Sequence, residues 1–242
     1  MLHRCSVLAA AFALACASAS SAAWAETAAS PTDARAAAPL DLAQSLPTPI
    51  RPPQGMPKGP PGALDGQQRA LVTRVNGYLT SVHTLIGDFV QIGPDGRRTE
   101  GKFYLQKPGR MRFEYNDPNP LELVADGKSL AIRDRKLATQ DLLLLSQTPL
   151  RFLLSDRVDL LKEGNLINVY QDDVFITLVV DEKQTFGGTH RLMLMFSTKD
   201  AQLKQWTVTD PQGYETTVAL YNLDSSRKPS PDLFRINYER MN

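Results

Sequence analysis

The chain has 242 residues, with 27 basic and 26 acidic side chains and a net charge of +1. Domains that bind nucleic acid usually carry a strong basic excess, so this balance argues against a polyanion as the partner. The two cysteines, Cys5 and Cys16, both lie near the N-terminus. No disulfide, thiol nucleophile or thiolate metal site is therefore expected after Cys16.

The first 25 residues have the pattern of a secretory signal peptide. Arg4 precedes an apolar stretch from Val7 to Cys16, and Ala23-Trp24-Ala25 supplies an A-x-A cleavage site before Glu26. An uncleaved membrane anchor is the alternative, but it needs about 20 apolar residues, which this stretch does not reach. We therefore predict export to the periplasm of a Gram-negative cell and a mature protein without cysteine.

The segment Ala13-Leu14-Ala15-Cys16 supports a second alternative, because it loosely resembles a lipobox. Cys16 would then be acylated and become the first residue of a membrane-tethered protein. A lipobox usually carries its leucine one position earlier, so we prefer cleavage after Ala25.

Residues 26–65 differ in composition from the rest of the chain. They hold nine of the seventeen prolines and no Phe, Trp or Tyr, so they cannot bury enough apolar surface to offset the entropy of folding. We predict a disordered, proline-rich tether with polyproline character. A proline motif that docks on a partner is the alternative. The remaining residues, 66–242, suit one domain with a single core.

A helix is predicted at the start of this domain. Asp65 is placed to cap it, and Gln68 follows at the spacing of a capping box. Apolar residues then recur at intervals of three and four, which places them on one helix face. Such a stripe is typical of core packing and does not by itself indicate a ligand. Its members are Leu71, Val72, Val75, Leu79, Val82 and Ile86.

Beyond this helix the apolar pattern changes to a period of two, which is typical of strands. Phe103 and Leu105 alternate with polar residues, and residues 111–115 repeat the pattern. Asp95-Gly96 and Asp126-Gly127 offer residues that tolerate the positive φ of hairpin turns. Further strands are predicted at Leu121–Ala125, Ser129–Asp134, Asn165–Tyr170, Val174–Val180, Thr189–Ser197, Leu203–Thr209, Glu215–Leu223 and Phe234–Tyr238.

One more helical region interrupts the strands. Asp141–Ser146 is predicted as a short helical piece, and Thr148-Pro149 as the start of a second helix with Thr148 as its cap. Two helical elements cannot cover both faces of so many strands, so we expect them on the concave side, as a lid. The predicted fold class is mainly β, a strongly curved antiparallel sheet or partly closed barrel.

Several short motifs follow one another in a characteristic order over some eighty residues. They are Phe89-Val90-Gln91, Gly101-Lys102-Phe103-Tyr104-Leu105, Lys107-Pro108-Gly109, Arg110-Met111-Arg112-Phe113-Glu114-Tyr115, Pro120, Leu123-Val124, Asp126-Gly127-Lys128, Leu130 and Thr148-Pro149-Leu150. In these motifs, and from about Leu71 onward, the chain resembles the LolA family of periplasmic carriers of outer-membrane lipoproteins. The C-terminal half matches only in its strand pattern.

The resemblance implies an unclosed antiparallel barrel with a helical lid over an apolar cavity. It implies a carrier of acylated lipoproteins, which receives them from an inner-membrane ABC transporter and hands them to an outer-membrane acceptor. We expect a monomer that is not an enzyme and that binds no cofactor, metal or nucleic acid.

The resemblance also implies which side chains would contact lipid. The alternative is that the same side chains fill an ordinary core, which periodicity alone cannot distinguish. The candidate lipid-binding residues are Leu79, Val82, Phe89, Phe103, Leu105, Met111, Phe113, Leu123, Leu150, Leu153 and Leu154.

Lys107 is the candidate lid latch. The residue before this proline is commonly Arg in the family, where its side chain bonds the lid backbone. Lysine keeps the charge but lacks the planar five-donor fork of arginine, so we expect a looser latch or one with other partners. The proline-rich tether is a second departure from the family.

Arg97 and Arg98 form a basic pair beside the predicted Asp95-Gly96 turn. Such a pair on a hairpin tip is suited to docking an acidic surface of a transporter or acceptor. Ordinary solubility explains the same pair equally well.

No catalytic motif is present. His83 and His190, the two histidines of the mature chain, stand in no motif with a serine, and no phosphate-cradling loop occurs. Three non-catalytic alternatives to lipoprotein carriage stay open: a carrier of another lipid, a periplasmic stress sensor that shares the fold, and a tethered acceptor with acylated Cys16.

Overall fold

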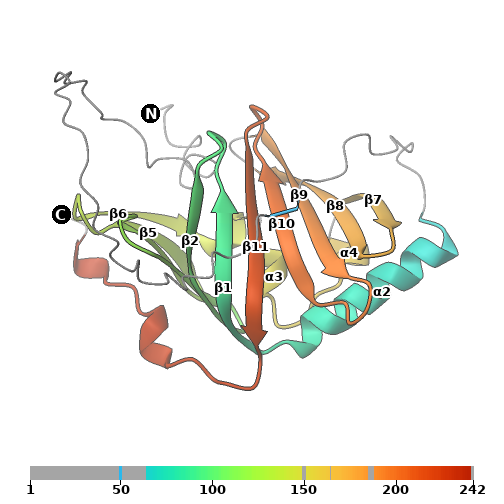
Figure 1. Cartoon of the computed structure of the whole chain (residues 1–242), viewed down its shortest axis with the longest axis horizontal. Coiled ribbons are helices and arrows are strands. Elements are labelled where there is room, and N and C mark those ends of the chain that lie inside the picture. The colour runs from blue at the N-terminus through green and yellow to red at the C-terminus, as the bar shows by residue number, and fades with distance from the viewer. Residues whose placement is uncertain (1–48, 51–63, 149–150, 164, 185–187, 241–242) are drawn as a thin grey trace, which may run out of the picture.

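The structure is a computed structural model that describes residues 49–50, 64–148, 151–163, 165–184 and 188–240. Its main element is one antiparallel sheet of eleven strands in the order β6-β5-β4-β3-β2-β1-β11-β10-β9-β8-β7 (Figure 1). The strands are β1 (Thr84–Ile92), β2 (Arg98–Gln106), β3 (Arg110–Tyr115), β4 (Leu121–Asp126), β5 (Ser129–Asp134), β6 (Thr139–Leu144), β7 (Asn165–Gln171), β8 (Phe175–Gln184), β9 (Gly188–Ser197), β10 (Leu203–Thr209) and β11 (Glu215–Asp224).

The sheet extends from its middle in two directions. The first strand, β1, pairs with the last strand, β11, so β2 to β6 follow on one side of this pair and β10 to β7 on the other. Strands β6 and β7 are consecutive in the chain but lie at opposite edges. The connection between them therefore runs from one edge to the other, and it carries the short helices α3 (Arg151–Leu154) and α4 (Leu160–Glu163).

Helix α2 (Gly66–Ser81) confirms the predicted helix and its capping box. The Asp65 carboxylate accepts from the Gln68 amide at 2.7 Å, and the Gln68 side chain accepts from the Asp65 amide at 3.0 Å, which satisfies two amides at the helix start. The predicted stripe is wrong beyond the helix end, because Ile86 lies in β1. There the backbone pairs with both β2 and β11, and these ladders outweigh the helical spacing of the apolar residues.

The expectation of a helical piece at Asp141–Ser146 is wrong. Strand β6 ends at Leu144, after pairing with β5 from Thr139↔Asp134 to Leu144↔Ser129, and only Leu145–Gln147 form a 3-10 turn. A short apolar run has no period that separates a strand from a helix. The free edge of β5 therefore decides the conformation.

The expectation of a strand at Phe234–Tyr238 is also wrong. Two 3-10 turns, Pro231–Phe234 and Tyr238–Arg240, occupy this region. The segment follows β11, whose two edges are already paired with β1 and β10, so no strand position is free beside it. It packs instead near β3 and β4, where Arg112 Nη1 donates to the Leu233 carbonyl at 3.2 Å.

The hairpin turns follow the prediction, since Gly96 and Gly127 have φ of +76° and +108°. Gly109, in the β2–β3 turn, has φ of +74°, and a Cβ there would lie 2.6 Å from the Gly127 Cα. The β2–β3 and β4–β5 turns thus pack directly on each other, and only glycine at position 109 permits this approach.

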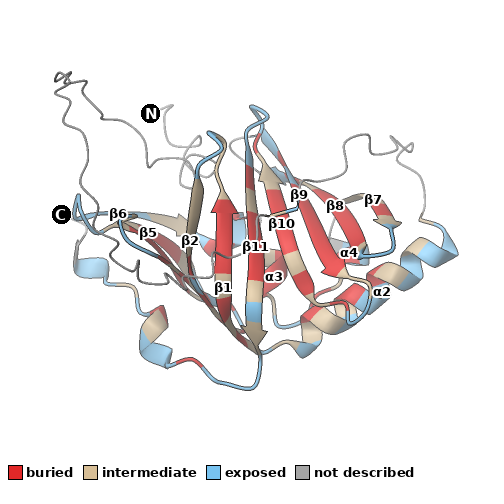
Figure 2. Cartoon of the chain, in the orientation of Figure 1, coloured by how far each residue is buried: buried red, intermediate tan, exposed pale blue. Residues whose placement is uncertain are grey.

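One face of the sheet, which we call the inner face, holds the hydrophobic core. Figure 2 shows buried residues along the middle of strands β1 and β8 to β11, while the strand ends and turns are exposed. The core joins the inner-face side chains to Val72, Val75 and Leu79 of α2 and to Phe152, Leu153 and Leu154 of α3. The helices therefore cover the inner face, as expected for a lid.

Candidate functional site: an apolar cavity beneath the helices

A small apolar cavity lies between the inner face of the sheet, the end of α2 and helix α3. Its volume of about 20 Å³ is room for about one water molecule. The cavity is therefore closed, and its walls are in contact almost throughout. The lining residues are Tyr78, Leu79, Val82, Leu85, Phe103, Leu105, Lys107, Met111, Leu153, Leu154, Leu203, Trp206 and Leu220.

The candidate lipid-binding residues separate into two groups. Phe89, Phe113 and Leu123 are fully buried in the core but do not line the cavity. Leu150 lies outside the described residues. The candidates that do line the cavity are Leu79, Val82, Phe103, Leu105, Met111, Leu153 and Leu154.

Five lining residues were not expected from the sequence: Tyr78, Leu85, Leu203, Trp206 and Leu220. Leu203 and Trp206 are three positions apart in β10, and strict alternation would place them on opposite faces. A register shift between Leu203 and Gln205, in the pairing with β9, brings both onto the inner face. The bulk of Trp206 within a predicted strand is a sequence signal that could have indicated this wall.

An aromatic cluster forms the wall behind the cavity. The Phe113 ring lies 4.8 Å from Phe89, 5.0 Å from Phe103 and 6.1 Å from Trp206, measured between ring centroids. The Phe89 and Trp206 rings meet Phe113 edge-on, at 79° and 77°, a geometry that the quadrupoles of aromatic rings favour. Phe113 is 0% exposed. It therefore acts as a core residue of the sheet in this closed form.

The lid segment, which we define as residues 151–163, is joined to the sheet at two points. The Gly109 amide donates to the Leu154 carbonyl at 2.9 Å, which ties α3 to the β2–β3 turn. On the other side, Arg151 Nε lies 2.6 Å from Glu182 Oε1 of β8. These two contacts hold α3 over the inner face from both halves of the sheet.

The lid segment is joined to α2 by two further hydrogen bonds. The Leu160 amide donates to the Asn76 side chain at 3.2 Å, and the Val158 amide donates to the Thr80 hydroxyl at 3.3 Å. Both acceptors lie on one side of α2, four residues apart. Asn76, a weak helix former, thus supplies an acceptor for the first amide of α4.

Lys107 lines the cavity and is 8% exposed. Its ammonium donates to the Leu79 carbonyl oxygen, in the last turn of α2, where carbonyl groups lack an intrahelical partner and favour positive charge. Burial lowers the pKa of Lys107 to about 8, and attraction to Asp156 of the lid segment opposes this shift. Lys107 thus forms its hydrogen bond with α2 and interacts with the lid segment through electrostatic attraction to Asp156. The latch role itself stays a prediction.

Tyr78 is the other polar group of the lining. Burial raises its pKa to about 12, and a hydrogen bond with the Leu203 backbone opposes this shift. The hydroxyl is therefore neutral at physiological pH, and Lys107 carries the one charge among the lining residues.

Arg97 and Arg98 lie at the β1–β2 hairpin, far along the chain from the lid segment. Arg97 Nε is 3.1 Å from Asp95, and Arg98 Nη2 is 2.7 Å from Glu100. Neighbouring carboxylates therefore offset much of the positive charge of this pair. Its docking role stays a prediction.

The residues that the structure describes contain no group of three His, Cys, Asp or Glu side chains placed to hold a metal ion. None of the helices in that part of the chain is long and apolar enough to cross a membrane. The predicted signal peptide, the lipobox at Cys16 and most of the tether lie outside the described residues.

Comparison with known proteins shows to which family the chain belongs. A family model described as outer membrane lipoprotein carrier protein LolA matches residues 80–237. The chain belongs to the LolA family. The family is one of carriers rather than enzymes, in agreement with the expectation from the sequence, and the unclosed antiparallel sheet agrees with the predicted fold class.

Relatives of this LolA-family chain are distant. An outer-membrane lipoprotein carrier protein of Methylococcus capsulatus is 27% identical over 179 residues, which span 68% of this chain and 82% of the relative. An uncharacterized protein of Rickettsia prowazekii is 23% identical over 158 residues, 65% of this chain and 72% of the relative. Among solved structures, a LolA superfamily protein from Nitrosomonas europaea covers 73% of this chain and 100% of its own length, at 9% identity and a TM-score of 0.40.

Proposed function

We propose that the protein is a periplasmic carrier that shields the acyl chains of lipoproteins between an inner-membrane ABC transporter and an outer-membrane acceptor. One observation carries the proposal: a LolA-family sheet has an apolar cavity on its inner face, covered by a lid segment that few polar contacts hold. The signal-peptide pattern that ends at Ala25 supports a periplasmic location.

The energetics of acyl chains require such a cover. Burying a chain gains roughly 0.8 kcal/mol per CH₂, so a chain of about sixteen carbons gains about 12 kcal/mol. A lipoprotein with several such chains would not leave a membrane for water at a useful rate. A carrier has to cover the chains and yet release them to an acceptor, so its affinity has to be adjustable.

The closed cavity of about 20 Å³ is far too small for an acyl chain. Binding therefore requires the lid segment or α2 to move away from the inner face. The polar contacts that would break are Gly109–Leu154, Arg151–Glu182 and the bonds from the Val158 and Leu160 amides to Thr80 and Asn76. A ligand that fits only the open form shifts the population toward it. These polar contacts and the buried apolar side chains of the lid segment together set the free energy of that opening.

The proposal is tested by displacement of a hydrophobic fluorophore from the full mature chain. The folded protein should take up the probe, and an acylated lipoprotein should displace it, while the same lipoprotein without acyl chains should not. Displacement by free phospholipid alone would favour carriage of another lipid. Failure of the acylated lipoprotein to displace the probe would contradict lipoprotein carriage.

A matched pair of valine variants locates the binding site. Val82→Glu places a carboxylate at the half-buried rim of the cavity, where it can hydrate but would oppose an acyl chain, and we expect loss of uptake. Val174→Glu places the same charge at an exposed position, 58% accessible, that does not line the cavity, and uptake should be unchanged. Circular dichroism checks that both variants are folded; equal uptake by both would place the site elsewhere.

A further inference from the structure

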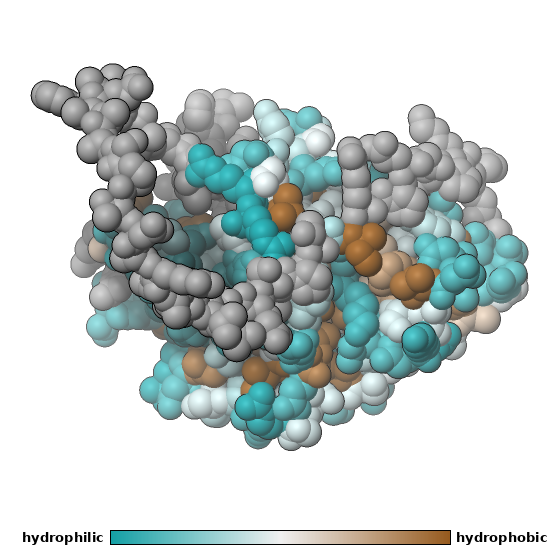
Figure 3. Space-filling view, viewed as in Figure 1, coloured by the Kyte–Doolittle hydropathy of each residue, from teal (hydrophilic) through white to brown (hydrophobic). Residues whose placement is uncertain are grey.

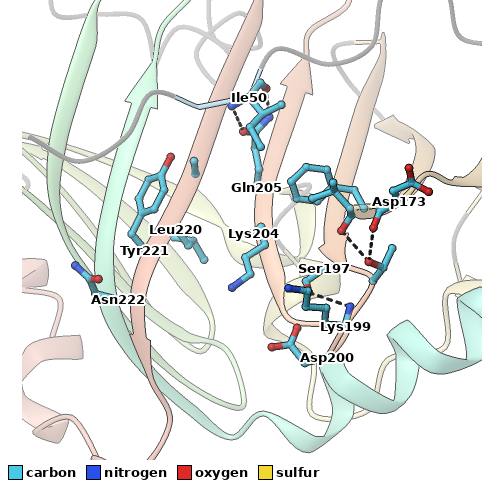
Figure 4. Close-up of a pocket in the computed structure, with 14 residues that line it drawn as sticks. Ile50, Asp173, Ser197, Lys199, Asp200, Lys204, Gln205, Leu220, Tyr221 and Asn222 are labelled. Carbon is cyan, nitrogen blue, oxygen red and sulfur yellow. Dashed lines mark hydrogen bonds between the residues drawn. The ribbon is translucent and has the colours of Figure 1, made fainter.

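The opposite face of the sheet, which we call the outer face, carries a groove that the proposed carrier function does not use. Its volume is about 780 Å³, and Figure 4 shows its lining side chains on strands β9, β10 and β11 and on the turn before β8. Figure 3 shows apolar atoms on this side of the molecule, interrupted by hydrophilic ones. Val174, 58% exposed, contributes to the apolar part.

A distant part of the chain already lies in this groove. The Ile50 amide donates to Gln205 Oε1 at 2.9 Å, and Gln205 Nε2 donates to the Ile50 carbonyl at 2.7 Å (Figure 4). These two bonds connect residues 155 positions apart. The Gln205 side-chain amide thus binds both the N–H and the C=O group of Ile50. A neighbouring strand would form the same pair of hydrogen bonds with that residue.

Gln205 is well placed for this contact. Its side chain is 3% exposed, and its second amide hydrogen points at Met195 Sδ, 3.5 Å away. Without Ile50, the carbonyl oxygen of this amide and one of its hydrogens would lose the protein partners that the structure gives them. The backbone of Ile50 therefore completes the hydrogen bonding of the Gln205 amide.

The sequence around Ile50 is suited to the same contact. Proline has no N–H group, and Ile50 stands between Pro49 and Arg51-Pro52-Pro53, so Ile50 and Arg51 supply the only amides of this stretch. Proline-rich chains favour extended conformations and lose little entropy when they bind in one. Binding through a single backbone residue needs no continuous ladder of amides.

From these observations we infer that the outer face has a docking site for the chain's own proline-rich segment, with Gln205 as the residue that binds the Ile50 backbone. The segment is then fixed at two places, at Ile50 on the outer face and at Asp65 before α2. Gln205 and Trp206 are consecutive in β10, so the docking site and the cavity wall lie on opposite faces of one strand. Docking would keep this part of the segment away from the cavity, whatever ligand the cavity takes.

Amide hydrogen exchange of Ile50, measured by NMR on the full mature chain, tests the inference. We expect the Ile50 amide to exchange at least about tenfold more slowly in the wild type than in the Gln205→Met variant. This substitution preserves the side-chain volume but removes both hydrogen bonds. Gln212→Met removes an equivalent amide from an exposed turn and should leave Ile50 protected. An Ile50 amide that exchanges as fast in the wild type as in Gln205→Met would overturn the inference.

The occupant is tested in the same samples. Docking within one chain predicts that the protection is independent of protein concentration and that the protein sediments as a monomer. Protection that rises with concentration together with a dimer would assign the groove to Ile50 of a second copy and would contradict docking in cis. Because these readouts do not involve lipid, they are independent of the outcome for the cavity.

Discussion

The sheet wall and the lid segment face each other across the cavity, and they are held in different ways. The wall has continuous ladders between neighbouring strands and an aromatic cluster centred on Phe113. The described lid segment has two short helices, which are held by single hydrogen bonds, one ion pair and the packing of apolar side chains such as Phe152 and Leu160 in the core. In the proposed carrier, a cover without ladders can open while the strands of the wall stay paired, and the free energy of opening then includes the apolar contacts that the lid segment loses.

The largest expected effect on stability comes from a substitution in the sheet wall. Phe113→Ala removes the ring that contacts Phe89, Phe103 and Trp206, and such large-to-small changes in a core cost about 3–5 kcal/mol. Urea denaturation followed by circular dichroism measures this loss. Tyr214→Ala, at a position 60% exposed, is the control and should change stability by no more than about 0.5 kcal/mol. A small loss at Phe113 would mean that the wall is not rigid.

A smaller effect is expected where the lid segment is attached. Glu182→Gln removes the charge that pairs with Arg151, and because the Arg151 side chain is 38% exposed, the loss of stability should stay at about 1 kcal/mol or less. The rate of probe uptake should nevertheless increase several-fold, because the contact between α3 and β8 loses its ionic character and weakens. Stopped-flow fluorescence measures this rate.

The neighbouring ion pair provides the control for this experiment. Asp181 and Arg191 are 2.7 Å apart on the other face of the same strands, so Asp181→Asn removes an equivalent charge without touching the lid segment. Its uptake rate should equal that of the wild type. Equal acceleration in both variants would show that general loosening of the sheet, rather than lid opening, controls uptake.

The last prediction concerns Lys107 and the pH dependence of stability. Its pKa is lowered from 10.5 to about 8 in the folded state, so between pH 8 and 10.5 the unfolded state binds more protons than the folded state. Stability contributed by this residue therefore rises with pH across that window and is lowest below pH 8. Compared with Lys107→Leu, the wild type should gain stability between pH 7 and pH 10. A difference that is constant with pH would show that the ammonium is well solvated.

Much of the fold follows from short-range signals in the sequence. The capping box at Asp65 and Gln68, the glycine turns after Asp95 and Asp126, and most strand positions are encoded within a few neighbouring residues. The motifs from Phe89 to Leu130 were sufficient to indicate the LolA family. These features are predictable because a cap, a positive φ or an alternating pattern acts locally.

Tertiary structure alone decided the other features. Helix α2 ends at Ser81 because β1 pairs with two strands, and Asp141–Ser146 is largely strand because β5 offers a free edge. The division of apolar residues between core and cavity, such as Phe113 and Met111, depends on packing between elements far apart in the chain. The same holds for the register shift that turns Trp206 inward and for the Gln205 contact with Ile50. Periodicity reports which face a side chain occupies, but what covers that face is set by long-range contacts.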